Sequence, residues 1–198
     1  YLYWYGRILA DAHKTDDALS ELKLALEVEP KYADALEAMG RIYFDRNDFK
    51  RAVEHFQQAL KIDTSRQAVR VAIGDAQMKM EDWSGAISSY QEALEADPEL
   101  KSAFAQLAKA YQEKKQYPKA IEWFRKAVQA DPDNADAWRE MGYMLKDAKK
   151  KKDAVTAFKK YLELRPEAQD AKQIEDEILF INQFTISFKL QQTSHTIS

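Results

Sequence analysis

The chain has 198 residues, and its 30 basic and 33 acidic side chains give a net charge of −3 at neutral pH. This balance argues against a nucleic-acid partner, because nucleic-acid binding needs a clustered excess of Lys and Arg. The absence of cysteine excludes disulfide scaffolds and thiolate chemistry, but it leaves the compartment, cytoplasmic or periplasmic, open.

Composition also indicates the fold class. Five glycines and five prolines are few for a β protein, whereas 45% hydrophobic and 32% charged residues suit helices with one buried and one wet face. No apolar run approaches the roughly 18 residues of a membrane-spanning helix, so we expect no membrane insertion by this segment. The chain opens inside a helical pattern without an initiator Met, and we therefore expect it to be a piece of a longer protein.

Apolar residues at helical spacing, separated by short polar turns, predict five helix pairs. In chain order these are residues 1–12 with 15–28, 34–46 with 49–62, 67–80 with 83–96, 101–114 with 117–130, and 135–148 with 151–164. Proline cannot extend a preceding helix, and prolines end four of the pairs on one grid of 34 residues. They are Pro30, Pro98, Pro132 and Pro166, and Thr64 holds the remaining grid point.

Small and large residues follow the same period. A small residue recurs in each first helix, at Gly6, Gly40, Gly74, Ala108 and Gly142. Each second helix has an alanine and then a large apolar residue, at Ala18 and Leu22, Ala52 and Phe56, Ala86 and Tyr90, Ala120 and Phe124, and Ala154 and Phe158. Small residues let two helix backbones approach, and we expect the large side chain to fill the space where the helices diverge.

This pattern resembles the tetratricopeptide repeat (TPR) family, whose repeats read W-x2-L-G-x2-Y, then A-x3-F, then P. The fifth repeat matches with Trp138, Met141, Gly142, Leu145, Ala154, Phe158 and Pro166. The resemblance covers about residues 1–166 and implies an all-α fold, a right-handed α-solenoid (superhelix) of five helix-turn-helix repeats. The implied repeats are residues 1–30, 33–64, 67–98, 101–132 and 135–166.

The residues after Pro166 divide into two parts. Residues 167–182 carry apolar side chains between acids, and we expect a helix that caps the last exposed apolar face. In residues 183–198, apolar Phe184, Ile186 and Phe188 alternate with polar residues, and no acid follows Glu177. We expect this tail to be disordered or an appended segment foreign to the array, with a strand that pairs with a partner as the alternative.

No constellation points to catalysis, a cofactor or a metal. The three histidines, His13, His55 and His195, stand far apart without a second ligand at metal-binding spacing, and no phosphate loop or nucleophile motif occurs. We therefore expect no enzyme and no bound cofactor. Four consecutive lysines, Lys149–Lys152, form the densest positive region; a solvated turn is the simpler interpretation, and contact with an acidic partner is the alternative.

The resemblance also suggests a binding face. In this family the first helices of successive repeats line a concave groove that receives a peptide or helix of a partner protein. Transferred to this chain, the groove residues are Tyr3, Arg7, Glu37, Arg41, Phe44, Val71, Asp75, Met78, Gln106, Lys109, Arg139 and Tyr143. Members that clamp a C-terminal carboxylate use Asn on two of these helices, and this chain has none at the corresponding places, which argues against that role.

The junction between the second and third repeats departs from the pattern. Thr64 replaces the proline, Arg70 stands where a large apolar residue is expected, and Gln77 replaces a Tyr or Leu. We expect either weaker stacking there or polar side chains that reach a ligand, with Arg70 packing by its stem as the simpler alternative.

Taken together, the sequence predicts a protein–protein interaction scaffold for a peptide or helix. The alternatives are a self-assembling scaffold that forms homo-oligomers through its end repeats or tail, and a substrate-recruiting domain of a larger protein. The Ala-Leu-Glu-x-Asp-Pro junction at residues 93–98, with similar junctions at 25–30 and 127–132, resembles those of bacterial arrays.

Overall fold

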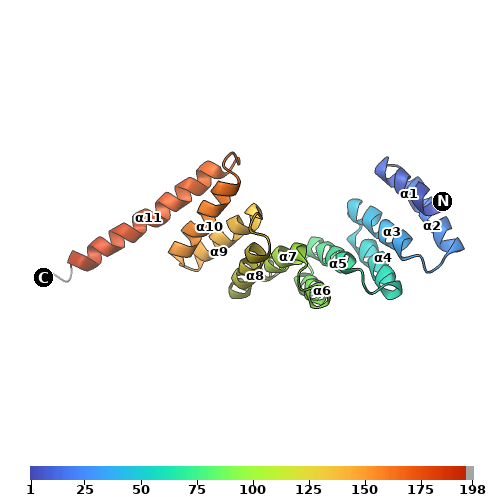
Figure 1. The fold of residues 1–198 in the computed structure, drawn as a ribbon, viewed down its shortest axis with the longest axis horizontal. Helices are drawn as coiled ribbons and strands as arrows, with labels where there is room; N and C mark the ends of the chain where they lie inside the picture. Colours follow the sequence, from blue (N-terminus) through green and yellow to red (C-terminus); the bar gives the residue numbers. More distant parts are fainter. Residues whose placement is uncertain (195–198) are drawn as a thin grey trace. The chain divides into compact units, whose positions relative to one another are not determined.

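A computed structural model of the chain describes the backbone of residues 1–194 and the side chains of residues 1–183. Within that part the fold is all-α, as predicted, with eleven helices and no strand (Figure 1). The helices are α1 (Leu2–Asp11), α2 (Thr15–Val28), α3 (Ala33–Asp45), α4 (Phe49–Ile62), α5 (Gln67–Lys79), α6 (Trp83–Ala96), α7 (Lys101–Glu113), α8 (Tyr117–Ala130), α9 (Ala135–Asp147), α10 (Lys151–Leu164) and α11 (Ala171–Ser194). Every end of the first ten lies within one residue of its expected position, so the sequence pattern located these helices correctly.

The chain forms two compact units, Tyr1–Gln116 and Tyr117–Ser198. In the first unit α1 packs with α2, α3 with α4 and α5 with α6, successive pairs are in contact, and α7 packs on α6. In the second unit α9 packs with α10, α8 packs on α9, and α11 packs on α10. The boundary falls between α7 and α8, inside the predicted fourth repeat, so the boundaries of that repeat stay a prediction.

Close approach of the paired helices explains the small residues of the pattern. A Cβ atom added to Gly40 of α3 would lie 2.6 Å from the ring of Phe56 on α4, and one added to Gly74 of α5 would lie 2.5 Å from the ring of Tyr90 on α6. Real Cβ atoms do not come this close to a ring, so the aromatic side chain lies directly on the backbone of the first helix. Phe56 and Tyr90 are fully buried there.

The turn inside each helix pair has one backbone conformation throughout. Five residues with positive φ, near 60°, follow one another at the 34-residue spacing: His13, Asn47, Glu81, Lys115 and Lys149. At the end of α3, the Asn47 N–H donates to Phe44 O at 2.9 Å and the Asp48 N–H donates to Tyr43 O at 2.8 Å. This bonding satisfies the last carbonyls of the helix and usually places Gly or Asn at the left-handed residue. Only Asn47 fits that preference, so the sequence marks these turns by their polarity and not by the residue type at the left-handed position.

The last helix is longer than predicted. α11 begins at Ala171, buries Ile174 and Ile181, and continues through Ser194. The expectation of a disordered or strand-like segment is therefore wrong for residues 183–194. Extending an established helix adds one backbone hydrogen bond per residue, whereas a lone strand has no neighbour to bond with, so the alternating pattern was misleading here. Residues 195–198, which include His195, lie outside the described part of the chain.

Candidate functional site

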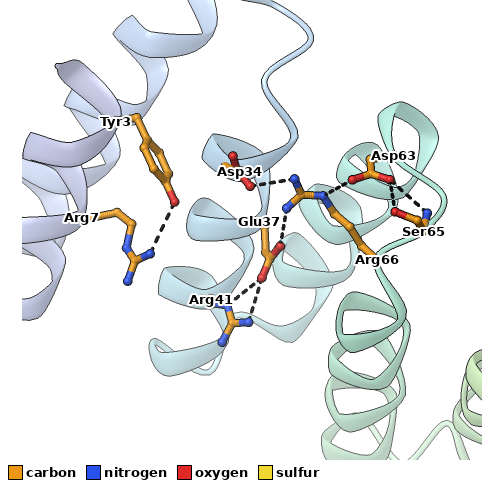
Figure 2. Close-up of polar contacts among 8 residues, drawn as sticks. All are labelled: Tyr3, Arg7, Asp34, Glu37, Arg41, Asp63, Ser65 and Arg66. Atoms are coloured by element: carbon orange, nitrogen blue, oxygen red, sulfur yellow. Dashed lines mark hydrogen bonds and ion pairs between the residues drawn. The ribbon is translucent and has the colours of Figure 1, made fainter. Parts of the chain in front are cut away.

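The first two repeats form a cleft of about 530 Å³ between α1 and α3. Four of the predicted groove residues line it: Tyr3 and Arg7 from α1, and Glu37 and Arg41 from α3. Arg41 donates to Glu37 Oε1 through Nε at 3.2 Å and through Nη2 at 2.8 Å. Arg7 donates from Nη1 to the Tyr3 hydroxyl at 3.5 Å and forms no ion pair with any described residue, so its remaining donors face the cleft (Figure 2).

Arg66, which sequence reasoning missed, connects this cleft to the next repeat. It stands at the start of α5, and its guanidinium contacts Asp34 Oδ1 at 2.7 Å, Glu37 Oε2 at 2.8 Å and Asp63 Oδ2 at 3.0 Å (Figure 2). Burial acts to lower the pKa of Arg66, but hydrogen bonds to Asp34 and Glu37 outweigh burial and raise the pKa above its ordinary value. The Glu37 carboxylate therefore lies between two arginines, which fixes its position in the cleft.

The irregular junction is bonded within the chain. Arg70 Nη1 donates to Thr64 O at 2.6 Å and to Gln67 Oε1 at 3.0 Å, and the Ser89 hydroxyl donates to Gln77 Oε1 at 2.6 Å. Both polar side chains therefore have partners within the first unit, and their contact with a ligand stays a prediction. Weaker stacking at the junction stays a prediction. The ion pairs of Arg66 with Asp34 and Glu37, which connect the start of α5 to α3, argue against it.

A second cleft, of about 300 Å³, lies between α3 and α5. The predicted groove residues Arg41, Phe44 and Asp75 line it, together with Asp45. Asp75 is half-buried and accepts a hydrogen bond from the hydroxyl of the buried Tyr90 at 2.7 Å. Burial raises the pKa of Asp75 above its ordinary value, although the Tyr90 hydrogen bond acts to lower it.

The other predicted groove residues do not line these two clefts. Val71 of α5 is buried and belongs to the packing between helices, while Met78 of α5 and Gln106 and Lys109 of α7 are half-buried. In the second unit, Arg139 Nη1 contacts Asp170 Oδ2 at 3.1 Å, just before α11, and the Tyr161 hydroxyl donates to the same carboxylate. The ring of Tyr143 packs edge-on against Phe158, with 5.1 Å between centroids. Arg139 and Tyr143 therefore help to hold α10 and the start of α11.

Neither a metal-binding cluster nor a membrane-spanning helix occurs among the described residues. No group of three or more His, Cys, Asp or Glu side chains gathers there. None of the described helices combines the length and apolar character needed to cross a membrane. His55 is half-buried, stacks on Tyr43 with 5.2 Å between ring centroids, and has its pKa lowered by burial.

Comparison with known proteins identifies the repeats. Family models described as tetratricopeptide repeat match residues 1–65, 71–135 and 107–169. A search of curated proteins found no match.

Solved structures share the fold at low sequence identity. MamA from Desulfovibrio magneticus RS-1 is 24% identical with a TM-score of 0.77, covering 85% of this chain and 95% of MamA. PilF from Pseudomonas aeruginosa is 21% identical with a TM-score of 0.76, covering 96% of this chain and 88% of PilF. YrrB, described as a TPR protein with an unusual peptide-binding site, is 20% identical with a TM-score of 0.74, covering 88% of this chain and 90% of YrrB.

The helix pairs, the repeated close contacts and the matched family models agree with one another. The fold is the TPR solenoid, which serves in general as a scaffold for protein–protein interaction. The chain belongs to the tetratricopeptide repeat family.

Proposed function

We propose that the chain holds a peptide segment of a partner protein against α1, α3 and α5. The observation that carries the proposal is the succession of two clefts on either side of α3, which share Arg41 and Asp45. A segment that follows both clefts would meet charged groups at each step, with Phe44 as an apolar contact in the second. Among the solved structures with this fold, YrrB is described as having a peptide-binding site, which is consistent with the proposal.

The charges of the face suit recognition without much rearrangement. Arg66 holds Glu37, and Glu37 in turn holds Arg41, so these groups need little ordering when a ligand binds. Arg7 has donors left for a carboxylate or carbonyl of the ligand, and Asp45 can accept from a basic or amide group. Arg and aromatic side chains of this kind are enriched among the residues that dominate binding energy.

The test is selection of binding peptides from a displayed random library, followed by affinity measurement with Arg41→Glu. Peptides selected on the wild-type chain should bind this variant at least about tenfold more weakly, because the ligand-facing charge is reversed. Lys61→Glu, an equal change of charge on the exposed side of α4, is the matched control and should leave affinity unchanged. Circular dichroism checks that both variants melt like the wild type. Selected peptides that bind Arg41→Glu normally would show that this face is not used.

A second candidate function, self-assembly, is favoured by the outer face of α1. Tyr5 and Ile8 are 53% and 63% exposed, whereas Met39 and Ile42, at the equivalent positions one repeat later, are 2% and 4% exposed. Apolar groups at these positions are covered by a preceding helix pair elsewhere in the first unit. A second copy of the chain could cover them here, and so could residues that precede Tyr1 in a longer protein. Mass measurement in solution with Tyr5→Glu/Ile8→Glu decides this; a wild-type chain that stays monomeric at high concentration excludes it.

A further inference from the structure

The turn between α9 and α10 concentrates positive charge. Lys149, Lys150, Lys151 and Lys152 follow one another there and are all exposed. Within the described side chains, Lys149, Lys150 and Lys152 form no ion pair. Two acids flank the run: Asp153 pairs with Arg125 at 2.9 Å, and Asp147 stands at the end of α9. The sequence holds no acid after Glu177, so the end of α11 supplies none.

The same turn is built differently in the second and third repeats. The residue before the second helix is Asp48 in one repeat and Asp82 in another, and each carboxylate accepts a hydrogen bond from a backbone N–H of the helix start. Lys150 takes this position before α10 and makes no such bond, as is also true of Lys14 before α2. Only the α9–α10 turn continues with further lysines, Lys151 and Lys152. Lysines at a helix start oppose the helix dipole and one another, so this turn should be less stable than one capped by an acid.

The lysines border a cleft with an apolar floor. The cleft holds about 760 Å³ between the start of α10 and α11, and Val155, Thr156, Ile181 and Asn182 line it beside the four lysines and Asp153. Ile181 is 3% exposed and Val155 is half-buried, so apolar side chains form its inner part. A concave site with cations at its rim and aliphatic groups at its floor matches a ligand that alternates carboxylates with apolar side chains.

We propose that this cleft binds an acidic segment of a partner protein, with apolar side chains of the segment entering between α10 and α11. Carboxylates of the segment would pair with Lys149, Lys150 and Lys152 at the rim. A nucleic acid or an anionic membrane fits less well, because either needs a broad basic surface, and the chain as a whole has a net charge of −3. The site uses no residue of the α1–α3–α5 face, so it stands whether or not that face binds a peptide.

The experiment measures binding of a fluorescent peptide that alternates Glu and Leu, by anisotropy, to the wild-type chain and to Lys150→Glu/Lys152→Glu. We expect the double variant to bind at least about tenfold more weakly, and wild-type binding to weaken as salt is added. Lys101→Glu/Lys115→Glu is the matched control: both lysines are exposed, the change in charge is the same, and Glu81 already occupies the position equivalent to Lys115. The control should bind the peptide like the wild type.

Thermal melting separates a binding defect from a folding defect. Because acids suit a helix start better than lysines, Lys150→Glu/Lys152→Glu should melt no lower than the wild type even though it loses the peptide. The proposal is overturned if the wild type does not bind the Glu-Leu peptide, if it binds a Gln-Leu peptide equally well, or if the double variant keeps full affinity. It is also overturned if duplex DNA or phosphatidylserine vesicles bind with this sensitivity to the variant and the Glu-Leu peptide does not.

Discussion

The α3–α4 turn and the α9–α10 turn have the same backbone and very different side chains. Both pass through a left-handed residue, Asn47 with φ 60° in one and Lys149 with φ 59° in the other, and both close with the same pair of backbone hydrogen bonds. In the first turn Asp48 then accepts from the Arg51 N–H at 3.1 Å, and the ring of Phe49 packs on Phe44. In the second turn Lys149, Lys150 and Lys151 stand in place of Asn47, Asp48 and Phe49.

The comparison separates what shapes a turn from what stabilises it. Because the backbone is the same with favourable and unfavourable residues, the packing of the helix pair sets the turn, and the turn residues change only its free energy. Gly40 on Phe56 and Gly142 on Phe158 make the same close contact in the two repeats. A repeat with this core keeps its fold even when its turn consists of lysines. The acidic-segment site is proposed at such a turn, between α9 and α10.

The largest expected effect tests whether the two repeats really share one core. Phe56→Ala and Phe158→Ala each remove a fully buried ring and should each lower the free energy of unfolding by about 3–5 kcal/mol. Urea denaturation followed by circular dichroism gives both values. A much smaller loss for Phe158→Ala would mean that the last repeat depends less on this contact, and the two turns would then no longer be matched.

A middle-sized effect is expected from giving the second turn the cap of the first. Lys150→Asp places a carboxylate where Asp48 and Asp82 stand, and should raise the free energy of unfolding by about 1 kcal/mol through the cap hydrogen bond and the helix dipole. Lys150→Gln is the control, since it removes the charge without supplying a strongly preferred cap. Equal melting temperatures for Lys150→Asp and Lys150→Gln would show that the whole gain in stability comes from removing the positive charge of Lys150.

The helix pairs were predictable because their signals are local and repeated. Prolines, turn polarity and the 34-residue spacing of small and large residues each fix a helix end or a buried face. The sequence did not predict residues 183–194 of α11, because apolar residues alternate with polar ones there as in a strand. Two-residue spacing alone does not show that these residues continue a helix that began at Ala171.

The candidate site was only partly predictable for a related reason. Periodicity places Tyr3, Arg7, Glu37 and Arg41 on first helices, and they do line one cleft. Periodicity does not give the partners of these residues. Arg66, which pairs with Glu37, lies outside the helices at a position that other repeats fill with Tyr32, Leu100 and Asn134. Likewise, Arg139 pairs with Asp170, which lies in the capping segment outside the repeats. Side-chain pairs between elements depend on distances that a repeat pattern does not contain.

The smallest expected effect is a difference in pH dependence between the two turns. The pKa of Asp48 lies below its ordinary value because the Arg51 side chain and then the Arg51 N–H bond to the carboxylate. Because the pKa of Asp48 is lower in the folded state than in the unfolded state, its ionised carboxylate stabilises the fold at pH values above the unfolded-state pKa of about 4. This stabilisation is lost as the pH falls toward the folded-state pKa. Asp48→Asn keeps a cap acceptor without the titration, so its melting temperature should fall less than that of the wild type between neutral pH and pH values below about 4.

The gain in stability from Lys150→Asp should shrink over the same pH interval, since that carboxylate also becomes protonated. If Asp48→Asn followed the wild-type pH profile, the acid of the first turn would contribute only as a hydrogen-bond acceptor, and the two turns would differ in capping rather than in charge.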